Sequence, residues 1–157
     1  MQFALGSFRW ICGCDRQQCE GDGRTPAGTY GFQLAFGTGP DPGVHYPYRQ
    51  AGTSDVWVDD ASSPLYNTWQ QLPADGRWSS AESLDQPAPY REAAAIAFNT
   101  ARVPGKGSAI FLHASLGHGT AGCVAVAEPT LMTLLRWLDP VRQPVIVMGP
   151  ESYVERR

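Results

Sequence analysis

Basic side chains are few in this sequence, and they are scattered along it. The chain carries 12 Lys and Arg against 15 Asp and Glu, which gives a formal net charge of -3. A nucleic-acid-binding surface needs a stripe of positive charge that can neutralise several phosphates. No segment supplies such a stripe, so we do not expect nucleic acid to be a partner.

Long apolar runs are also missing. A membrane-spanning helix needs roughly 18 consecutive apolar residues, and no stretch of the sequence approaches that length. Residues 1–14 lack a basic start followed by an apolar core, which is the pattern of a secretory signal. We therefore expect no membrane span, and we predict no export signal within this sequence.

The four cysteines, Cys12, Cys14, Cys19 and Cys123, are too few and too unevenly spaced for a disulfide framework. The first three are close enough in sequence to suggest a metal site. However, Cys-x-Cys spacing is tighter than usual for zinc, and no fourth ligand stands nearby. Plain thiols or one disulfide are favoured, and no metal site is predicted.

Glycine and proline are abundant instead, with 17 and 13 residues in a chain of 157. So many turn-forming residues argue against a helical bundle, and the length fits one domain, residues 1–157, with one core. Apolar patterns predict strands over 2–5, 29–36, 56–58, 108–113, 124–127 and 145–148. Helices are predicted over about 91–99 and about 129–138, where Pro129 opens a leucine stripe. The fold class is therefore mixed α/β, mainly β.

An apolar strand that ends in His113 is followed, ten residues after the histidine, by Cys123. A cysteine attacks as a thiolate, so it needs a base or a positive neighbour. We expect the chain to return antiparallel after His113, with the intervening glycines permitting a sharp turn. That return would bring both side chains to one rim, as nucleophile and base.

Two alternatives stay open. His118 lies nearer to Cys123 in sequence and could be the base, although glycines on both sides place it on a flexible tip. A buried cysteine is also a common small apolar residue, and a histidine after a strand is often only a polar rim residue. From spacing alone, a packed cysteine and a polar rim histidine are slightly favoured over a catalytic pair.

Groups near the cysteine fit acyl transfer. The backbone N–H groups of Ala121, Gly122 and Cys123 could form an oxyanion hole, and Thr120 or Ser115 could orient the imidazole.

Aromatic and amide side chains elsewhere could line a groove or pack in a core, and the sequence favours neither role. The candidates for substrate binding are Trp57, Tyr66, Asn67, Ser115 and His118.

Three segments carry a family resemblance: the Gly-Asp-Gly-Arg-Thr-Pro-Ala-Gly loop at 21–28, the strand into His113, and Thr-Ala-Gly-Cys-Val at 120–124. Together they resemble the catalytic domain of the L,D-transpeptidases, the YkuD-like family, in matching order over almost the whole chain. The sequence is most similar to a shorter branch of that family. Ala121 departs from the family pattern, because most members have Ser/Thr-His-Gly-Cys there.

The resemblance implies an L,D-transpeptidase-like β-sandwich sheet that uses no metal or organic cofactor. It implies Cys123 as nucleophile, His113 as base, Thr120 as the residue whose backbone orients the imidazole, and the amides of 121–123 as the oxyanion hole. The partners would be peptidoglycan stem peptides, outside the cytoplasm, with carbapenem β-lactams as covalent inhibitors. The alternatives are an L,D-carboxypeptidase, which the altered motif mildly favours, and a non-catalytic cell-wall-binding domain.

Overall fold

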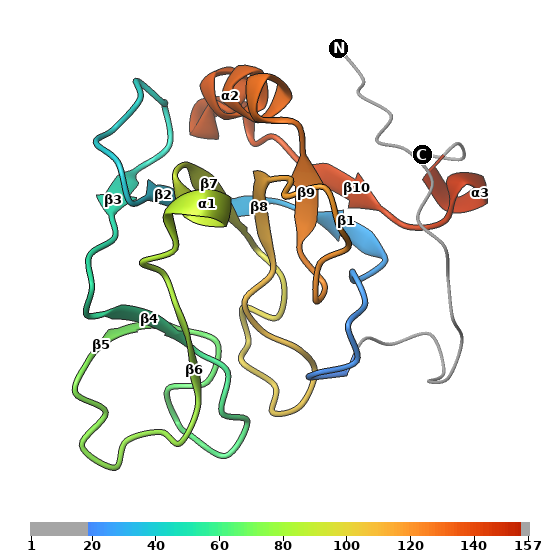
Figure 1. Ribbon diagram of the computed structural model, residues 1–157. Helices are drawn as coiled ribbons and strands as arrows, with labels where there is room; N and C mark the ends of the chain where they lie inside the picture. Colours follow the sequence, from blue (N-terminus) through green and yellow to red (C-terminus); the bar gives the residue numbers. More distant parts are fainter. Residues whose placement is uncertain (1–18, 155–157) are drawn as a thin grey trace.

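The computed structural model describes residues 19–154, and Figure 1 shows their strands gathered into three sheets. A five-stranded sheet has the order β3-β2-β7-β8-β9, a three-stranded sheet has the order β5-β4-β6, and β1 pairs with β10. The strands are β1 (Gly28–Tyr30), β2 (Phe32–Gly37), β3 (Tyr48–Gln50), β4 (Asp55–Val58), β5 (Trp69–Gln71), β6 (Ala81–Ser83), β7 (Ala93–Ile96), β8 (Phe111–Ala114), β9 (Val124–Val126) and β10 (Ile146–Met148). The helices are α1 (Pro87–Tyr90), α2 (Glu128–Trp137) and α3 (Glu151–Val154), with a 3-10 turn η1 (Pro140–Arg142).

The mainly β class is confirmed. The strands expected over 56–58, 124–127 and 145–148 are β4, β9 and β10, and the segment 29–36 forms β1 and β2 with a break at Gly31. The segment 108–113 joins the sheet only from Phe111. The expected strand at 2–5, like Cys12 and Cys14, lies outside the described residues.

The helix expected over 91–99 is wrong. Residues Ala93–Ile96 form β7, which lies between β2 and β8 near the middle of the five-stranded sheet. Alanine is the best helix former, but all four residues of this strand are buried. A strand covered on both faces is apolar throughout and shows no alternation, so its sequence cannot be told from a buried helix by periodicity.

The five-stranded sheet separates two apolar layers. Successive side chains of a strand point to opposite faces, and accordingly Ala94 and Leu112 pack in one layer while Ala95 and Phe111 pack in the other. The second layer also contains Cys123 and aromatic rings from β4 and α1. The candidate nucleophile therefore lies between the five-stranded sheet and the elements around β4.

Helix α2 covers the other face, as Figure 1 shows above β8 and β9. This confirms the helix expected over about 129–138. Pro129 occupies the first turn, and buried Leu131 and Leu135 point into the layer with Leu112. None of the helices within residues 19–154 is long and apolar enough to span a bilayer.

The buried side chain of Asn67 links Trp57 of the three-stranded sheet to segments next to the five-stranded sheet. The Asn67 Oδ1 atom accepts from Trp57 Nε1 at 2.8 Å and from the Ala109 N–H at 3.3 Å. Its Nδ2 donates to the carbonyls of Phe98 and Asn99, at 3.1 and 2.9 Å. Asn67 itself has φ 56°, a left-handed conformation that asparagine tolerates better than most residues. One side chain thus connects β4 to the segment that follows β7 and to the segment that precedes β8.

We expect Asn67→Ala to lower the free energy of unfolding by roughly 3 kcal/mol, because buried donors on Trp57 and Ala109 lose their acceptor. Asn67→Gly loses the same hydrogen bonds but accepts positive φ, so it should recover about 1 kcal/mol of that loss. Urea unfolding of the three proteins measures both differences. An Asn67→Ala protein as stable as the wild type would contradict this role.

Candidate active site

Strands β8 and β9 bring the candidate nucleophile and base to one face. They are parallel neighbours, with Leu112 opposite Val124 and His113 opposite Ala125. The expected antiparallel return is therefore wrong. The nine residues from 115 to 123 carry the chain from the end of β8 back to the level of its start, where β9 begins. A segment of nine residues is long enough to cover the length of a four-residue strand. Cys123 consequently lies beside Phe111, two residues before His113 on the same side of the sheet.

The Cys123 thiol is held by backbone groups of β8 and of the segment just before it. The Phe111 N–H donates to Sγ at 3.3 Å, and the thiol donates to the Ala109 carbonyl at 3.2 Å. The residue is only 9% exposed. Burial raises the pKa of the thiol to about 12, and the charge of Glu82 adds to this, while hydrogen bonds from Phe111 and Tyr90 act in the opposite direction. The resting cysteine is therefore a protonated thiol.

His113 is a neutral imidazole with a defined tautomer. Its Nδ1 lies 2.8 Å from the Ala114 carbonyl, and because a carbonyl only accepts, Nδ1 carries the proton and Nε2 has a free lone pair. The side chain is buried, and that burial lowers its pKa, although the bond to Ala114 acts the other way. The ring is thus prepared to accept a proton at Nε2.

The orienting carbonyl belongs to Ala114, whereas the sequence pointed to Thr120. The Thr120 hydroxyl instead donates to the Cys123 carbonyl at 2.7 Å and lies 3.4 Å from the Gly122 N–H. Thr120 therefore shapes the turn that carries the cysteine. No sequence signal distinguishes Ala114, because it contributes only its backbone.

The proposed oxyanion amides lie in this same turn. Gly122 is buried with φ 133°, a conformation that favours glycine, while Ala121 is exposed. The Gly122 N–H has only a long contact to Thr120, so it keeps capacity for a stronger acceptor.

The candidate substrate-binding residues fall into two groups. Trp57, Tyr66 and Asn67 are buried and make structural contacts, which places them behind the thiol, away from solvent. Ser115 and His118 are exposed on the segment that follows β8. There Ser115 Oγ accepts from the Gly117 N–H, and His118 Nδ1 bonds to the Gly119 carbonyl.

Two side chains beside the thiol were not recognised as site residues from sequence. Tyr90 is the last residue of α1, and its ring packs edge-on against His113 at 5.4 Å between centroids. Its hydroxyl donates to Glu82 Oε1, and its side chain packs in the same buried layer as Cys123. Tyr90 comes just before the segment expected to be a helix, so its position against the sheet could not be inferred.

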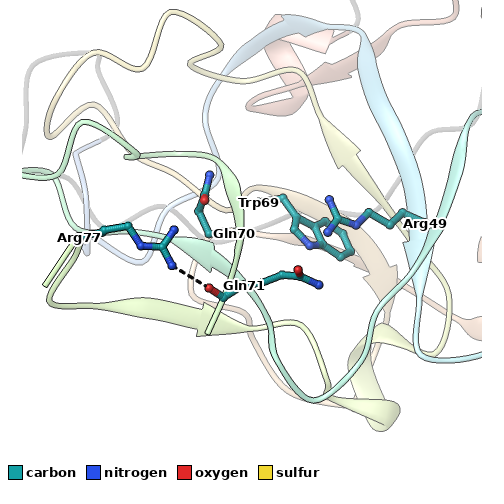
Figure 2. A pocket seen from close by; sticks show the side chains of 5 residues that line it. All are labelled: Arg49, Trp69, Gln70, Gln71 and Arg77. Atoms are coloured by element: carbon teal, nitrogen blue, oxygen red, sulfur yellow. Dashed lines mark hydrogen bonds between the residues drawn. The ribbon is translucent and has the colours of Figure 1, made fainter. Parts of the chain in front are cut away.

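A surface hollow lies elsewhere, on the three-stranded sheet. Figure 2 shows Arg49 over the Trp69 ring, at 4.2 Å from its centroid, and Arg77 donating to the Gln71 carbonyl at 3.1 Å. Cys123 and His113 do not line this hollow. Among residues 19–154, no group of three or more His, Cys, Asp or Glu side chains could hold a metal ion.

Comparison with known families assigns the chain to one of them. The model of the YkuD family, the L,D-transpeptidase catalytic domain, matches residues 2–147. The chain therefore belongs to the L,D-transpeptidase catalytic-domain family. No curated protein and no solved structure matches the sequence.

The buried thiol should make stability depend on alkaline pH. Above its ordinary pKa of 9.0, the unfolded thiol releases its proton, whereas the folded thiol keeps it until about 12. The wild type should therefore lose stability relative to Cys123→Ala as the pH rises, by up to about 1.4 kcal/mol per pH unit. Urea unfolding of both proteins at several pH values above about 8 tests this. Parallel pH profiles for the two proteins would contradict it.

Proposed function

We propose that this protein is a cysteine-dependent L,D-transpeptidase that joins peptidoglycan stem peptides through a thioester on Cys123. Family membership supports the class of reaction and the peptidoglycan partner. Since peptidoglycan lies outside the cytoplasmic membrane, the proposal also includes an extracytoplasmic site of action.

One observation carries the proposal: Cys123 and His113 share a face of the same sheet, and His113 has its free lone pair on Nε2. A nucleophile, a base and a group that orients the base are the parts that acyl transfer requires. Here the orienting group is the Ala114 carbonyl. A cysteine that served only as packing would need no such arrangement beside it.

The acylation step begins when the thiol turns from the Ala109 carbonyl toward His113. Nε2 takes the thiol proton, and Sγ attacks the carbonyl of the diamino-acid residue in a stem tetrapeptide. The C–N bond to the terminal D-residue breaks, and the imidazolium returns the proton to the leaving amine. The products are a thioester on Cys123 and the free D-amino acid.

The amides of Ala121, Gly122 and Cys123 would stabilise the oxyanion of this step, in a turn held by the Thr120 hydroxyl. Ser115 and His118, exposed on the segment after β8, are the proposed substrate contacts.

Deacylation decides the product. An amine of a second stem peptide attacks the thioester to form the cross-link, and the thiol is regenerated. Water would instead release a tripeptide, which is L,D-carboxypeptidase activity. Ala121 favours keeping this second candidate, because its exposed methyl group replaces the imidazole that most family members carry.

A carbapenem β-lactam should form a covalent adduct with the wild-type protein and none with Cys123→Ala. Cys19→Ala, which removes a thiol from another part of the chain, is the matched control and should still react. Mass spectrometry of the intact proteins measures the adduct. A wild-type protein that stays unmodified would argue for the non-catalytic wall-binding alternative.

His113→Ala should lower kcat with a tetrapeptide donor by roughly 100- to 10,000-fold, because the thiol loses its general base. His118→Ala should mainly raise KM, as expected for a substrate contact. Chromatography of reactions with and without an acceptor amine separates cross-linked dimer from tripeptide. A loss of kcat in His118→Ala with His113→Ala still active would reverse the assignment of the base.

A further inference from the structure

A glutamate and a tyrosine form a buried polar pair against the thiol. Glu82 lies in β6, opposite Trp57 of β4, and Tyr90 ends α1, which packs against β8 (Figure 1). The Tyr90 hydroxyl donates to Glu82 Oε1, and the Tyr90 side chain packs in the same buried layer as Cys123. The tyrosine is only 4% exposed. Nothing in the transfer reaction proposed above uses this pair.

The Tyr90 ring is held in one orientation by neighbouring rings, and this fixes the position of its hydroxyl group. It stands edge-on to Phe111 at 5.5 Å and to His113 at 5.4 Å between ring centroids, with interplanar angles of 90° and 87°. Phe111 is the same residue whose N–H donates to the sulfur. The Phe111 amide and the Tyr90 ring are therefore placed by the same packed layer that holds the thiol.

A tyrosine hydroxyl has one proton, and here two acceptors compete for it. When Glu82 is ionised, the carboxylate takes the Tyr90 proton, and the thiol keeps its own proton for the Ala109 carbonyl. When Glu82 is neutral, its O–H can donate to the Tyr90 oxygen, and the tyrosine proton is free for sulfur. A thiolate would then accept two hydrogen bonds, from Tyr90 and from the Phe111 N–H.

We propose that Glu82 and Tyr90 are positioning residues that set the ionisation of Cys123. In this proposal the ionised pair keeps the thiol protonated and unreactive, and the neutral pair stabilises the thiolate. The effect on the thiol is independent of any substrate, and only its catalytic consequence rests on the function proposed above.

The charges around the pair agree with this assignment. Burial raises the pKa of Glu82, and the carboxylates of Asp59 and Glu20 raise it further, while the hydrogen bond from Tyr90 lowers it. The other titratable groups facing the pair are Cys123 and His113, and the imidazole is neutral. The Glu82 carboxylate in turn raises the pKa of the Cys123 thiol. Neutralising one carboxyl group should therefore favour the thiolate.

The test is the pH profile of Cys123 alkylation by iodoacetamide, read from the tryptic peptide that follows Lys106 and contains no other cysteine. Glu82→Gln keeps the shape of the side chain and removes its charge. It should move the midpoint of the profile to lower pH and raise the rate near neutral pH about tenfold. Adding Tyr90→Phe to Glu82→Gln should slow the rate about tenfold relative to Glu82→Gln alone, because the thiolate loses the hydroxyl donor that the neutral side chain had left free.

The matched control is Glu92→Gln, which removes one carboxylate from the segment after α1, where Glu92 pairs with Arg91. It should leave the profile as in the wild type. Circular dichroism and thermal melting confirm that each variant is folded. The midpoint is the decisive quantity, because a change in access to a buried thiol scales the rate at every pH and leaves the midpoint where it was.

An unchanged midpoint in Glu82→Gln would overturn the proposal. A midpoint at higher pH would also overturn it, since Glu82 would then be acting as a base for the thiol. Neither measurement involves peptidoglycan or a β-lactam. A protein whose midpoint moves as expected but which forms no carbapenem adduct would therefore refute the proposed function and leave this inference standing.

Discussion

The Phe111 N–H donates to the Cys123 sulfur. This bond lies next to the first residue pair of the parallel strands β8 and β9, in which Leu112 is opposite Val124. A one-residue slip in that register would turn Cys123 to the opposite face of the sheet, into the layer covered by α2. The thiol would then lie apart from His113, whose place on β8 would not change. The spacing of Cys123 and His113 is thus a property of strand pairing. The remaining structure, including the apolar layers on both faces, holds that pairing in place.

Burial acts on the Cys123 thiol and the His113 imidazole in complementary ways. It disfavours the charged form of each, so the thiol keeps its proton and the imidazole stays without a second one. The resting pair is therefore neutral on both sides. In the proposed reaction the thiol leaves its bond to the Ala109 carbonyl, and a bound substrate would supply the polar surroundings that an ion pair needs. A buried, protonated thiol of this kind is protected from unspecific oxidation and alkylation.

Those parts of the structure that depend on local chemistry could be predicted from the sequence. Pro129 and the leucines after it define α2, and the apolar segment at 145–148 predicts β10. The prediction failed at Ala93–Ile96, because a strand buried on both faces has no periodicity and alanine favours helices in isolation. It also failed for the chain direction after β8, which depends on pairing between strands and not on the glycines of the connection.

The site residues divide in the same way. Cys123 and His113 stand out because their side chains are reactive. Ala109 and Ala114 contribute only carbonyl oxygens to these two residues, so their identity carries no signal. Trp57 and Asn67 have side chains suited to ligand binding, but they satisfy each other's hydrogen bonds inside the protein. Only the tertiary structure distinguishes a polar group that completes the core from one that meets a substrate.

The connection from β8 to β9 separates the parts of the site that can vary from those that cannot. Its two ends are fixed by strand pairing, while residues 115–119 between them are exposed. Lengthening a surface loop costs little free energy, since the closure entropy grows only with the logarithm of its length. Insertions there would add new surface next to Cys123 and His113 without shifting either residue. Under the proposed function, a change in the length of this one segment would alter which substrates the protein accepts, while Cys123 and His113 would keep their places on the sheet.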